Sequence, residues 1–343
     1  MRPGILGLGM AVPDKVLTNA DLEKMVDTSD EWITTRTGIK ERRIAPEGMT
    51  TSELAAQAGA KVLHHAGVVG WLEADLPLNE LVVDPEEVDL VIVATVTPEM
   101  LFPSTACLVQ NKLGCTNAGA FDLSAGCSGF VYGLDVASQM IASGNYRYIL
   151  VIGADLLSRV TDFTDRSTCV LFGDGAGAVL MGPVSGQGVM ATYLGADGSG
   201  GDKLRIAGSG PGAAERANGP ACIEMAGNDV FKFAVRIMGE AAVHVVEKAG
   251  LEPSDIDLFV PHQANIRIID AAARRLDLPP ERVFVNVAKY GNTSAASIPI
   301  ALVEAFQQGR IAAGDRLVLV GFGAGLTWAA AVLEWAEEVR PYV

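Results

Sequence analysis

The sequence has few cysteines, few aromatic residues and no basic run. Its five cysteines are an odd number without CxxC spacing, which argues against a disulfide framework or a zinc site and favours reduced thiols in the cytoplasm. A net charge of −15 repels phosphates, which argues against a nucleic-acid or anionic-membrane binder. The sequence therefore predicts a cytoplasmic protein without metal that binds neither nucleic acid nor membrane.

Long uninterrupted apolar runs are also missing. The uncharged stretches 175 to 196 and 317 to 333 are both broken by glycines, which is typical of buried strands and turns rather than membrane spans. The opening 13 residues are too short in apolar length and too rich in glycine and proline for a signal peptide, and predict a first strand and turn. With 343 residues, 49% of them hydrophobic and 20% charged, the chain can bury a large core in one or two α/β domains.

Apolar segments bounded by turn residues recur along the chain and predict buried strands. They span residues 88 to 96, 147 to 155, 175 to 182, 256 to 263, 315 to 323 and 327 to 335. Helical patterns occupy 51 to 66 and 230 to 250, and two further helices are expected after Cys127, to Ser143, and after Asn292, to Gly309.

The two halves of the chain repeat each other. Asp257 follows Asp89 by 168 residues, and Gly321 follows Gly153 by the same number. Two separated landmarks with one offset indicate a tandem duplication of a βαβ-type unit, with halves at 1–186 and 187–343. In this register Cys127 falls opposite Ala295, so the helix starts that carry Cys127 and Asn292 are expected to meet across a pseudo-two-fold axis.

Three motifs supply a thiol, an imidazole and a carboxamide. They are LSAGCSGF around Cys127, PHQAN around His262 and GNTSAAS around Asn292. A thiol exchanges readily with thioesters once a helix N-terminus or a cation lowers its pKa, and histidine and asparagine can both donate to one developing oxyanion. Taken alone, Cys127 would be a buried apolar residue and Asn292 a helix cap, but the combination favours carbanion chemistry at a thioester.

These motifs and several others resemble one family. The others are DEWITTRTGIKERR (30 to 43), TDRST (164 to 168), FGDGAGA (172 to 178), MAGNDVFKFAV (225 to 235) and GFGAGLTW (321 to 328). The chain resembles the β-ketoacyl-acyl carrier protein synthases III, which are thiolase-fold condensing enzymes. The resemblance implies an α-β-α-β-α layered fold, a homodimer, and the first condensation of type II fatty-acid synthesis between a short acyl-CoA and malonyl-acyl carrier protein.

The resemblance also implies roles for individual residues. Cys127 accepts the acyl group, and the backbone N–H groups of Cys127 and Ala324 hold the tetrahedral oxyanion. His262 and Asn292 bind the malonyl thioester oxygen during loss of carbon dioxide, and the carbanion then attacks the acyl-cysteine. No cofactor is implied, because acyl-CoA is a substrate.

Contact residues for the two substrates follow from the same resemblance. The coenzyme A positions are Thr28, Trp32, Arg36, Arg166, Gly227, Asn228, Phe231, Ala264 and Asn265, with Trp32 and Arg166 suited to stacking on adenine and Arg36 to the phosphates. The carrier-protein positions are Gln263, Ala264, Asn265, Ile266, Arg267, Lys232, Arg274 and Arg275. A small basic rim of this kind would let an acidic enzyme recruit an acidic carrier protein.

Some features depart from the family pattern or leave alternatives open. Residues 69 to 84 form a longer segment than expected, and Ala329 stands where a glycine is common in the family. The resemblance also implies that Phe102 lies where the family's dimer partner helps to close the acyl pocket. Acyl transfer to oxygen or nitrogen without decarboxylation, thioester hydrolysis, a non-catalytic scaffold and a role in secondary metabolism remain as alternatives. Primer length is not fixed by the sequence.

Overall fold

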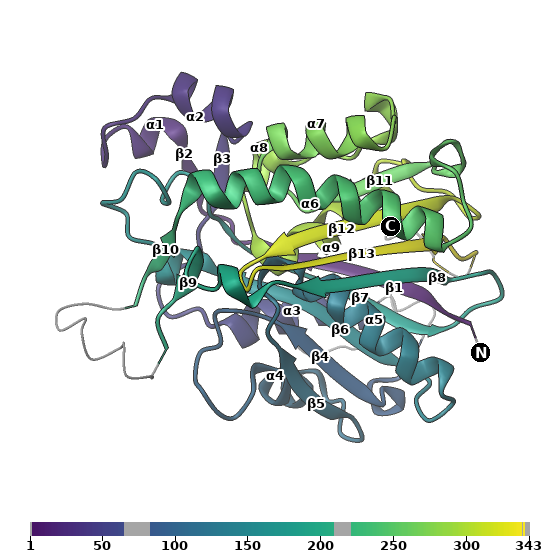
Figure 1. Ribbon diagram of the computed structural model, residues 1–343. Helices are drawn as coiled ribbons and strands as arrows, with labels where there is room; N and C mark the ends of the chain where they lie inside the picture. Colours follow the sequence, from purple (N-terminus) through teal and green to yellow (C-terminus); the bar gives the residue numbers. More distant parts are fainter. Residues whose placement is uncertain (1, 65–82, 209–220, 338, 340–343) are drawn as a thin grey trace.

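The chain folds into five layers in the order α-β-α-β-α (Figure 1). The computed structural model describes residues 2–64, 83–208, 221–337 and 339. Two mixed sheets enclose a central layer of helices, and further helices cover the outer face of each sheet. The expected layered fold is thereby confirmed.

The N-terminal sheet has the strand order β1-β7-β6-β4-β5. Its central strands β6 and β4 are parallel, β5 is parallel to β4, and β7 is antiparallel to both β6 and β1. The strands span Pro3–Ala11 (β1), Leu90–Ala94 (β4), Gly119–Leu123 (β5), Ile149–Leu156 (β6) and Asp174–Pro183 (β7).

The C-terminal sheet repeats this arrangement in the order β11-β12-β13-β8. Strands β11 and β12 are parallel, whereas β13 is antiparallel to both β12 and β8, as in the first sheet. The strands span Val189–Ala196 (β8), Leu258–Pro261 (β11), Arg316–Gly323 (β12) and Thr327–Glu334 (β13). A single parallel bridge between Phe259 and Val283 takes the place that β5 has in the first sheet, so the duplication is confirmed by topology.

The helices fill the remaining layers. Helices α5 (Gly129–Ala142) and α9 (Ser297–Gln307) lie between the sheets, α3 (Thr51–His64) and α4 (Thr105–Leu113) cover the first sheet, and α6 (Gly227–Lys248) covers the second with α7 (Ile266–Arg275) packed on it. Nearly every position of α9 is buried, as expected of a helix that is apolar on all sides. The shorter elements are β2 (Val16–Thr18), α1 (Asn19–Leu22), α2 (Asp30–Thr37), β3 (Glu41–Arg43), β9 (Leu204–Ile206), β10 (Ile223–Met225) and α8 (Val287–Tyr290).

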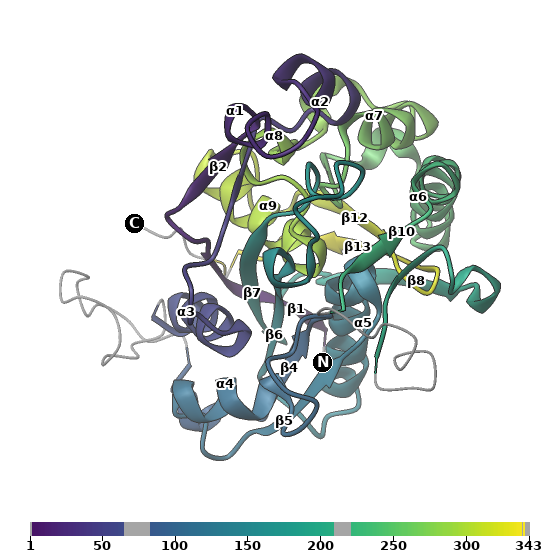
Figure 2. The same ribbon diagram turned by 90° about the vertical axis from the view of Figure 1, so that its left-hand side faces the viewer.

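The main hydrophobic core joins the two sheets through the central helices. Ile92 of β4, Phe130 of α5, Val260 of β11 and Leu302 of α9 belong to one buried cluster. Figure 2 shows α9 between the two sheets, with α2 beside α7 at one end of the molecule. The core therefore fixes the start of α5 against the start of α9, where the predicted nucleophile and carboxamide lie.

The predicted strands and helices are confirmed with small changes at their ends. His262 follows β11 instead of lying within the strand, and the opening residues form β1 as predicted. Residues 69 to 82 of the long segment lie outside the described residues. In the described ranges, no helix has the length and apolarity to cross a membrane.

Candidate active site

Cys127 lies in a tight turn that leads into α5. A short 3-10 turn, Gly126–Ser128, precedes the helix. A side chain on Gly126 would approach the Ala324 nitrogen to 2.6 Å, and one on Gly323 would approach the Cys127 nitrogen to 2.3 Å. Only glycines therefore allow these two backbone segments to pack, and the packing brings the N–H groups of Cys127 and Ala324 into one region, as an oxyanion site requires.

Hydroxyl groups fasten this turn to the start of β13. Thr327 Oγ1 donates to the Ala125 carbonyl at 2.8 Å and lies 2.8 Å from Ser128 Oγ, which itself donates to Ala125 at 2.7 Å. The two halves of the chain thus hold the nucleophile turn together. Such rigidity keeps donors in place before a charge develops.

Burial governs the protonation of the Cys127 thiol. Burial raises the pKa of the Cys127 thiol to about 12, against a smaller lowering effect of the Ser294 hydroxyl. The expectation of a lowered thiol pKa is wrong here, because the loss of hydration outweighs the hydrogen bond that lowers it. The thiol proton must therefore leave as the acyl group arrives.

His262 is buried directly after β11. Its Nδ1 lies 2.5 Å from Ser297 Oγ, at the first residue of α9. Ser297 Oγ also accepts the Gln263 N–H at 3.4 Å, and we assign its own hydrogen to Nδ1, which leaves the ring proton on Nε2. Nε2 is buried without a hydrogen-bond partner among the described residues.

The imidazole of His262 is uncharged. Burial lowers the pKa of His262 to about 3, and the edge of its ring packs against Phe322 at a centroid distance of 5.4 Å. A neutral ring that carries its proton on Nε2 is a hydrogen-bond donor rather than an ion-pair partner for a thiolate. The unsatisfied Nε2–H therefore suits an oxygen of a bound ligand.

Asn292 is held by its backbone and by one side-chain contact. Its N–H donates to the Leu171 carbonyl at 2.9 Å, and its carbonyl accepts the Gly173 N–H at 3.0 Å. Its Oδ1 accepts the Ser294 N–H at 2.9 Å, so the amide orientation leaves the hydrogens on Nδ2 to a ligand. Asn292 is thus a second neutral donor.

Two cavities meet at Cys127. One of about 120 Å³ is lined by Cys127, His262 and Asn292, together with Gly227, Phe231, Ala264 and Asn265. The other, of about 510 Å³, is lined by Cys127, Ala324 and Ser294 and by largely apolar side chains that include Val96, Leu157 and Phe172. The thiol can therefore meet one group from the apolar cavity and another from the cavity that holds the two neutral donors.

The remaining predicted coenzyme A positions lie toward α1 and α2. The guanidinium groups of Arg36 and Arg166 each lie 4.8 Å from the Trp32 ring, and the Thr28 hydroxyl is buried without a partner among the described residues. Asn265 Nδ2 donates to the Arg36 carbonyl at 3.0 Å and so joins α2 to α7. Asn228 is exposed in the first turn of α6 and does not line either of the two cavities.

The predicted carrier-protein positions divide into exposed and buried residues. Lys232, Arg267, Arg274 and Arg275 are exposed on α6 and α7, and Ile266 is partly exposed. Gln263 is only 1% exposed, and its amide bonds to Pro261, Phe284, Asn286 and Val287. The prediction that Gln263 contacts a carrier protein is therefore wrong, because its side chain is used inside the protein.

Sequence reasoning missed several residues around the site. Ser297 was part of a recognised motif, but its contact with His262 spans 35 positions, and sequence spacing gives no signal of it. Asp155, at the end of β6, accepts from Thr95, Val96 and Thr97 behind the nucleophile. Its place at the carboxyl end of a central strand was the one available signal. Among the described residues, no cluster of His, Cys, Asp or Glu could hold a metal ion.

Two family models match the chain. The one described as "3-Oxoacyl-[acyl-carrier-protein (ACP)] synthase III" matches residues 121–198, and the one for the C-terminal part of the same family matches residues 246–335. A curated relative from Caldanaerobacter subterraneus, named beta-ketoacyl-[acyl-carrier-protein] synthase III, is 54% identical, with coverage of 97% of this chain and 98% of the relative.

Solved structures resemble the chain over almost its whole length. The 3-oxoacyl-[acyl-carrier-protein] synthase III of Aquifex aeolicus is 49% identical, with a TM-score of 0.87 and coverage of 97% of this chain and 100% of that one. A priming β-ketosynthase from the R1128 polyketide pathway is 36% identical, with a TM-score of 0.89 and coverage of 99% and 97%. The chain thus belongs to the β-ketoacyl-[acyl-carrier-protein] synthase III family.

Proposed function

We propose that the chain condenses a short acyl-CoA with malonyl-acyl carrier protein, with loss of carbon dioxide, to give 3-oxoacyl-acyl carrier protein at the start of type II fatty-acid synthesis. The observation that carries this proposal is the unpartnered Nε2 of a neutral His262 in one cavity with Asn292 and Cys127. Two neutral donors beside a thiol suit an enolate, which acyl transfer alone does not form.

In the first half-reaction Cys127 attacks the acyl-CoA thioester. The new C–S bond forms at Cys127 Sγ, and the bond to coenzyme A sulfur breaks. The N–H groups of Cys127 and Ala324 stabilise the tetrahedral oxyanion, and the apolar cavity takes the acyl chain. The thiol proton leaves with the coenzyme A thiolate as free thiol or passes to solvent.

In the second half-reaction the malonyl thioester loses carbon dioxide. His262 Nε2–H and Asn292 Nδ2–H donate to the thioester oxygen while the C–C bond to the carboxylate breaks, and the electron pair becomes an enolate. The enolate carbon attacks the acyl group on Cys127, the C–S bond breaks, and the released thiolate takes a proton. Apart from protons exchanged with solvent, every step uses groups of this chain and its two substrates, and no cofactor is part of the proposal.

The two substrates have separate proposed binding regions. Trp32, Arg36 and Arg166, with Thr28 and Asn228, hold the nucleotide end of coenzyme A, while Gly227, Phe231, Ala264 and Asn265 line its path to the thiol. The exposed cations Lys232, Arg267, Arg274 and Arg275, beside Ile266, form the rim for an acidic carrier protein. This rim lets a chain of net charge −15 bind an acidic partner.

A homodimer in the cytoplasm completes the proposal. Leu101 and Phe102 are 82% and 85% exposed, and Leu101 also lines the apolar cavity. Strand β5 is at the edge of its sheet, and Phe121 on it is also exposed. Exposed apolar side chains beside a sheet edge favour a second copy there, which would cover the outer part of the acyl cavity.

Intact-mass measurement tests the proposed reaction. The protein is incubated with a panel of short acyl-CoAs and then with malonyl-acyl carrier protein. An acyl adduct on Cys127 that disappears as carbon dioxide and a 3-oxoacyl product form is the expected result, and it also identifies the primer. An adduct that persists until a hydroxyl or amine acceptor is added would contradict condensation and indicate plain acyl transfer.

A further inference from the structure

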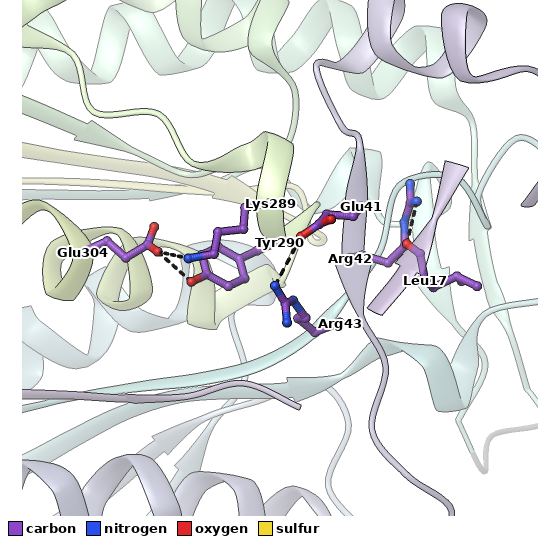
Figure 3. Close-up of polar contacts among 7 residues, drawn as sticks. All are labelled: Leu17, Glu41, Arg42, Arg43, Lys289, Tyr290 and Glu304. Carbon is purple, nitrogen blue, oxygen red and sulfur yellow. Dashed lines mark hydrogen bonds and ion pairs between the residues drawn. The ribbon is translucent and has the colours of Figure 1, made fainter. Parts of the chain in front are cut away.

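A buried carboxylate lies eight residues into α9, away from the reacting groups. Glu304 is only 7% exposed. Its Oε1 accepts from Lys289 Nζ and from Tyr290 OH, both at 2.7 Å (Figure 3). Its Oε2 accepts from Asn286 Nδ2 at 2.9 Å. We name these four side chains the Glu304 network.

All three donors of the network lie in the segment directly before Asn292. Asn286 precedes α8, Lys289 and Tyr290 end it, and one glycine separates Tyr290 from Asn292. Gln263 Oε1 holds the other end of the segment, where it accepts the N–H groups of Asn286 at 2.9 Å and Val287 at 3.2 Å. Gln263, which follows His262, and Glu304 of α9 therefore both form hydrogen bonds with the same short turn, which consists of Asn286 and α8.

Charge makes Glu304 a fixed acceptor. Burial alone would raise the pKa of Glu304, but hydrogen bonds from Lys289, Tyr290 and Asn286 outweigh burial and hold it below its usual range. An ionised carboxylate can only accept, so it orients all three donors at once. The Tyr290 ring also lies 5.0 Å from Lys289 Nζ and 6.0 Å from the Arg43 guanidinium of β3 (Figure 3).

Helix α9 connects this network to both neutral donors of the site. Its first residue, Ser297, contacts His262 Nδ1. Glu304 lies two turns later on the same helix and forms hydrogen bonds with the α8 turn, which directly precedes Asn292. Buried networks of this kind specify one arrangement when every member is satisfied. A shift of about 1 Å at a reacting group costs up to roughly 100-fold in rate.

We propose that Glu304 is a positioning residue for the decarboxylation step, in which it fixes the α8 turn so that the Asn292 amide meets the malonyl thioester oxygen. The proposal rests on the proposed function. It assigns Glu304 no role in acylation of Cys127, because the nucleophile turn is held by Thr327 and Ser128 instead.

Glu304→Gln tests the proposal because it keeps the shape of the side chain and removes its charge. Acylation of Cys127 by acetyl-CoA is followed by intact mass, and carbon dioxide release from malonyl-acyl carrier protein is followed separately. We expect acylation within about 2-fold of wild type and carbon dioxide release lowered about 10- to 100-fold. Equal losses in both half-reactions, or an unchanged release rate, would overturn the proposal.

A double-mutant cycle with Asn292→Ala distinguishes an effect of Glu304 on the position of the Asn292 amide from a general loss of stability. If Glu304 acts through Asn292, Glu304→Gln lowers the residual release rate of Asn292→Ala no further. Additive losses would contradict the proposal. Tyr290→Phe, which removes one donor, is the fallback if Glu304→Gln fails to fold, and it should slow release alone by a smaller factor.

The wild type in the same assays distinguishes this proposal from the proposed function. If the wild type itself releases no carbon dioxide, the proposed function fails. If the wild type condenses and only the Glu304 variants behave otherwise than expected, the positioning role fails and the function stands. Glu240→Gln, which breaks an exposed pair with Arg236 on α6, is the matched control and should change neither half-reaction.

Discussion

The starts of α5 and α9 are related by the duplication yet carry different chemistry. At α5, two glycine-dependent backbone contacts place a thiol beside two N–H groups. At the start of α9, the Ser297 hydroxyl contacts the His262 ring, and Asn292 is held by backbone hydrogen bonds to Leu171 and Gly173. A duplicated fold thus supplies two facing helix starts, one suited to a covalent bond and the other to a transient oxyanion.

The difference also appears in how each start is supported. The turn that carries Cys127 is held by hydrogen bonds from the hydroxyls of Ser128 and Thr327 to a backbone carbonyl. The α8 turn, which precedes Asn292, is held instead by the ionised Glu304 and by the amide of Gln263. Damage to one support should therefore impair one half-reaction and spare the other.

Cys127→Ser should abolish the acyl-enzyme. Serine has no comparable nucleophilicity here, since no base is bonded to the side chain, and we expect overall condensation to fall by at least about 10³-fold. Intact mass after incubation with acyl-CoA checks this. Cys107→Ser, at an exposed thiol, is the control, and an acyl adduct on the Cys127→Ser protein would contradict the assignment of the nucleophile.

Ser297→Ala should move the His262 proton. Without the hydroxyl, Nδ1 loses its donor, the Nε2–H form is no longer favoured, and carbon dioxide release should fall about 10-fold, the equivalent of about 1.4 kcal/mol. Nitrogen-15 spectra of the imidazoles report the tautomer directly, because the chain has only four histidines. An unchanged Nε2–H tautomer in the variant would show that Ser297 does not set it.

His262 should make the fold sensitive to acid. Its pKa is lowered to about 3 in the folded protein, whereas an unfolded histidine titrates near about 6.5. The unfolded state therefore binds more protons between these values, and stability falls as the pH drops below about 6.5, by about 2 kcal/mol at pH 5. Urea unfolding of wild type and His262→Gln at pH 7 and pH 5 measures the difference, and a constant gap between the two proteins would refute it.

Exposed ion pairs should contribute least to the free energy of unfolding. Arg236 and Glu240 form an i,i+4 pair at 3.0 Å on α6, with both side chains more than 40% exposed. Such pairs contribute about 0.3–0.5 kcal/mol, so Glu240→Gln should shift the urea midpoint only slightly. A loss of more than about 1 kcal/mol would contradict this prediction.

Much of the fold could be predicted from sequence because the signals were local or repeated. The apolar runs placed the main strands, and the common offset of Asp89 and Asp257 and of Gly153 and Gly321 predicted two related sheets. The missing fifth strand of the second sheet, reduced to a bridge at Val283, could not be predicted, since pairing at a sheet edge depends on tertiary contacts.

The residues of the site could be predicted from sequence, but their protonation states and the hydrogen bonds that hold them could not. The three motifs identified Cys127, His262 and Asn292, which the fold brings to one cavity. Burial raises the pKa of the Cys127 thiol, where a lowered pKa was expected. The Gln263 side chain is buried, where a surface contact was expected. Desolvation depends on packing from distant segments, as does the contact between Glu304 and Tyr290, and neither has a sequence pattern.

The claim that separate parts of the site serve the two half-reactions is tested most directly by measuring both of them in Asn292→Ala. We predict that acylation of Cys127 by acyl-CoA, measured by intact mass, stays within about 3-fold of wild type, while carbon dioxide release from malonyl-acyl carrier protein falls about 10²- to 10³-fold, the usual cost of one oxyanion donor. A parallel loss of acylation and release would contradict the account, because Asn292 would then support the nucleophile as well as the enolate.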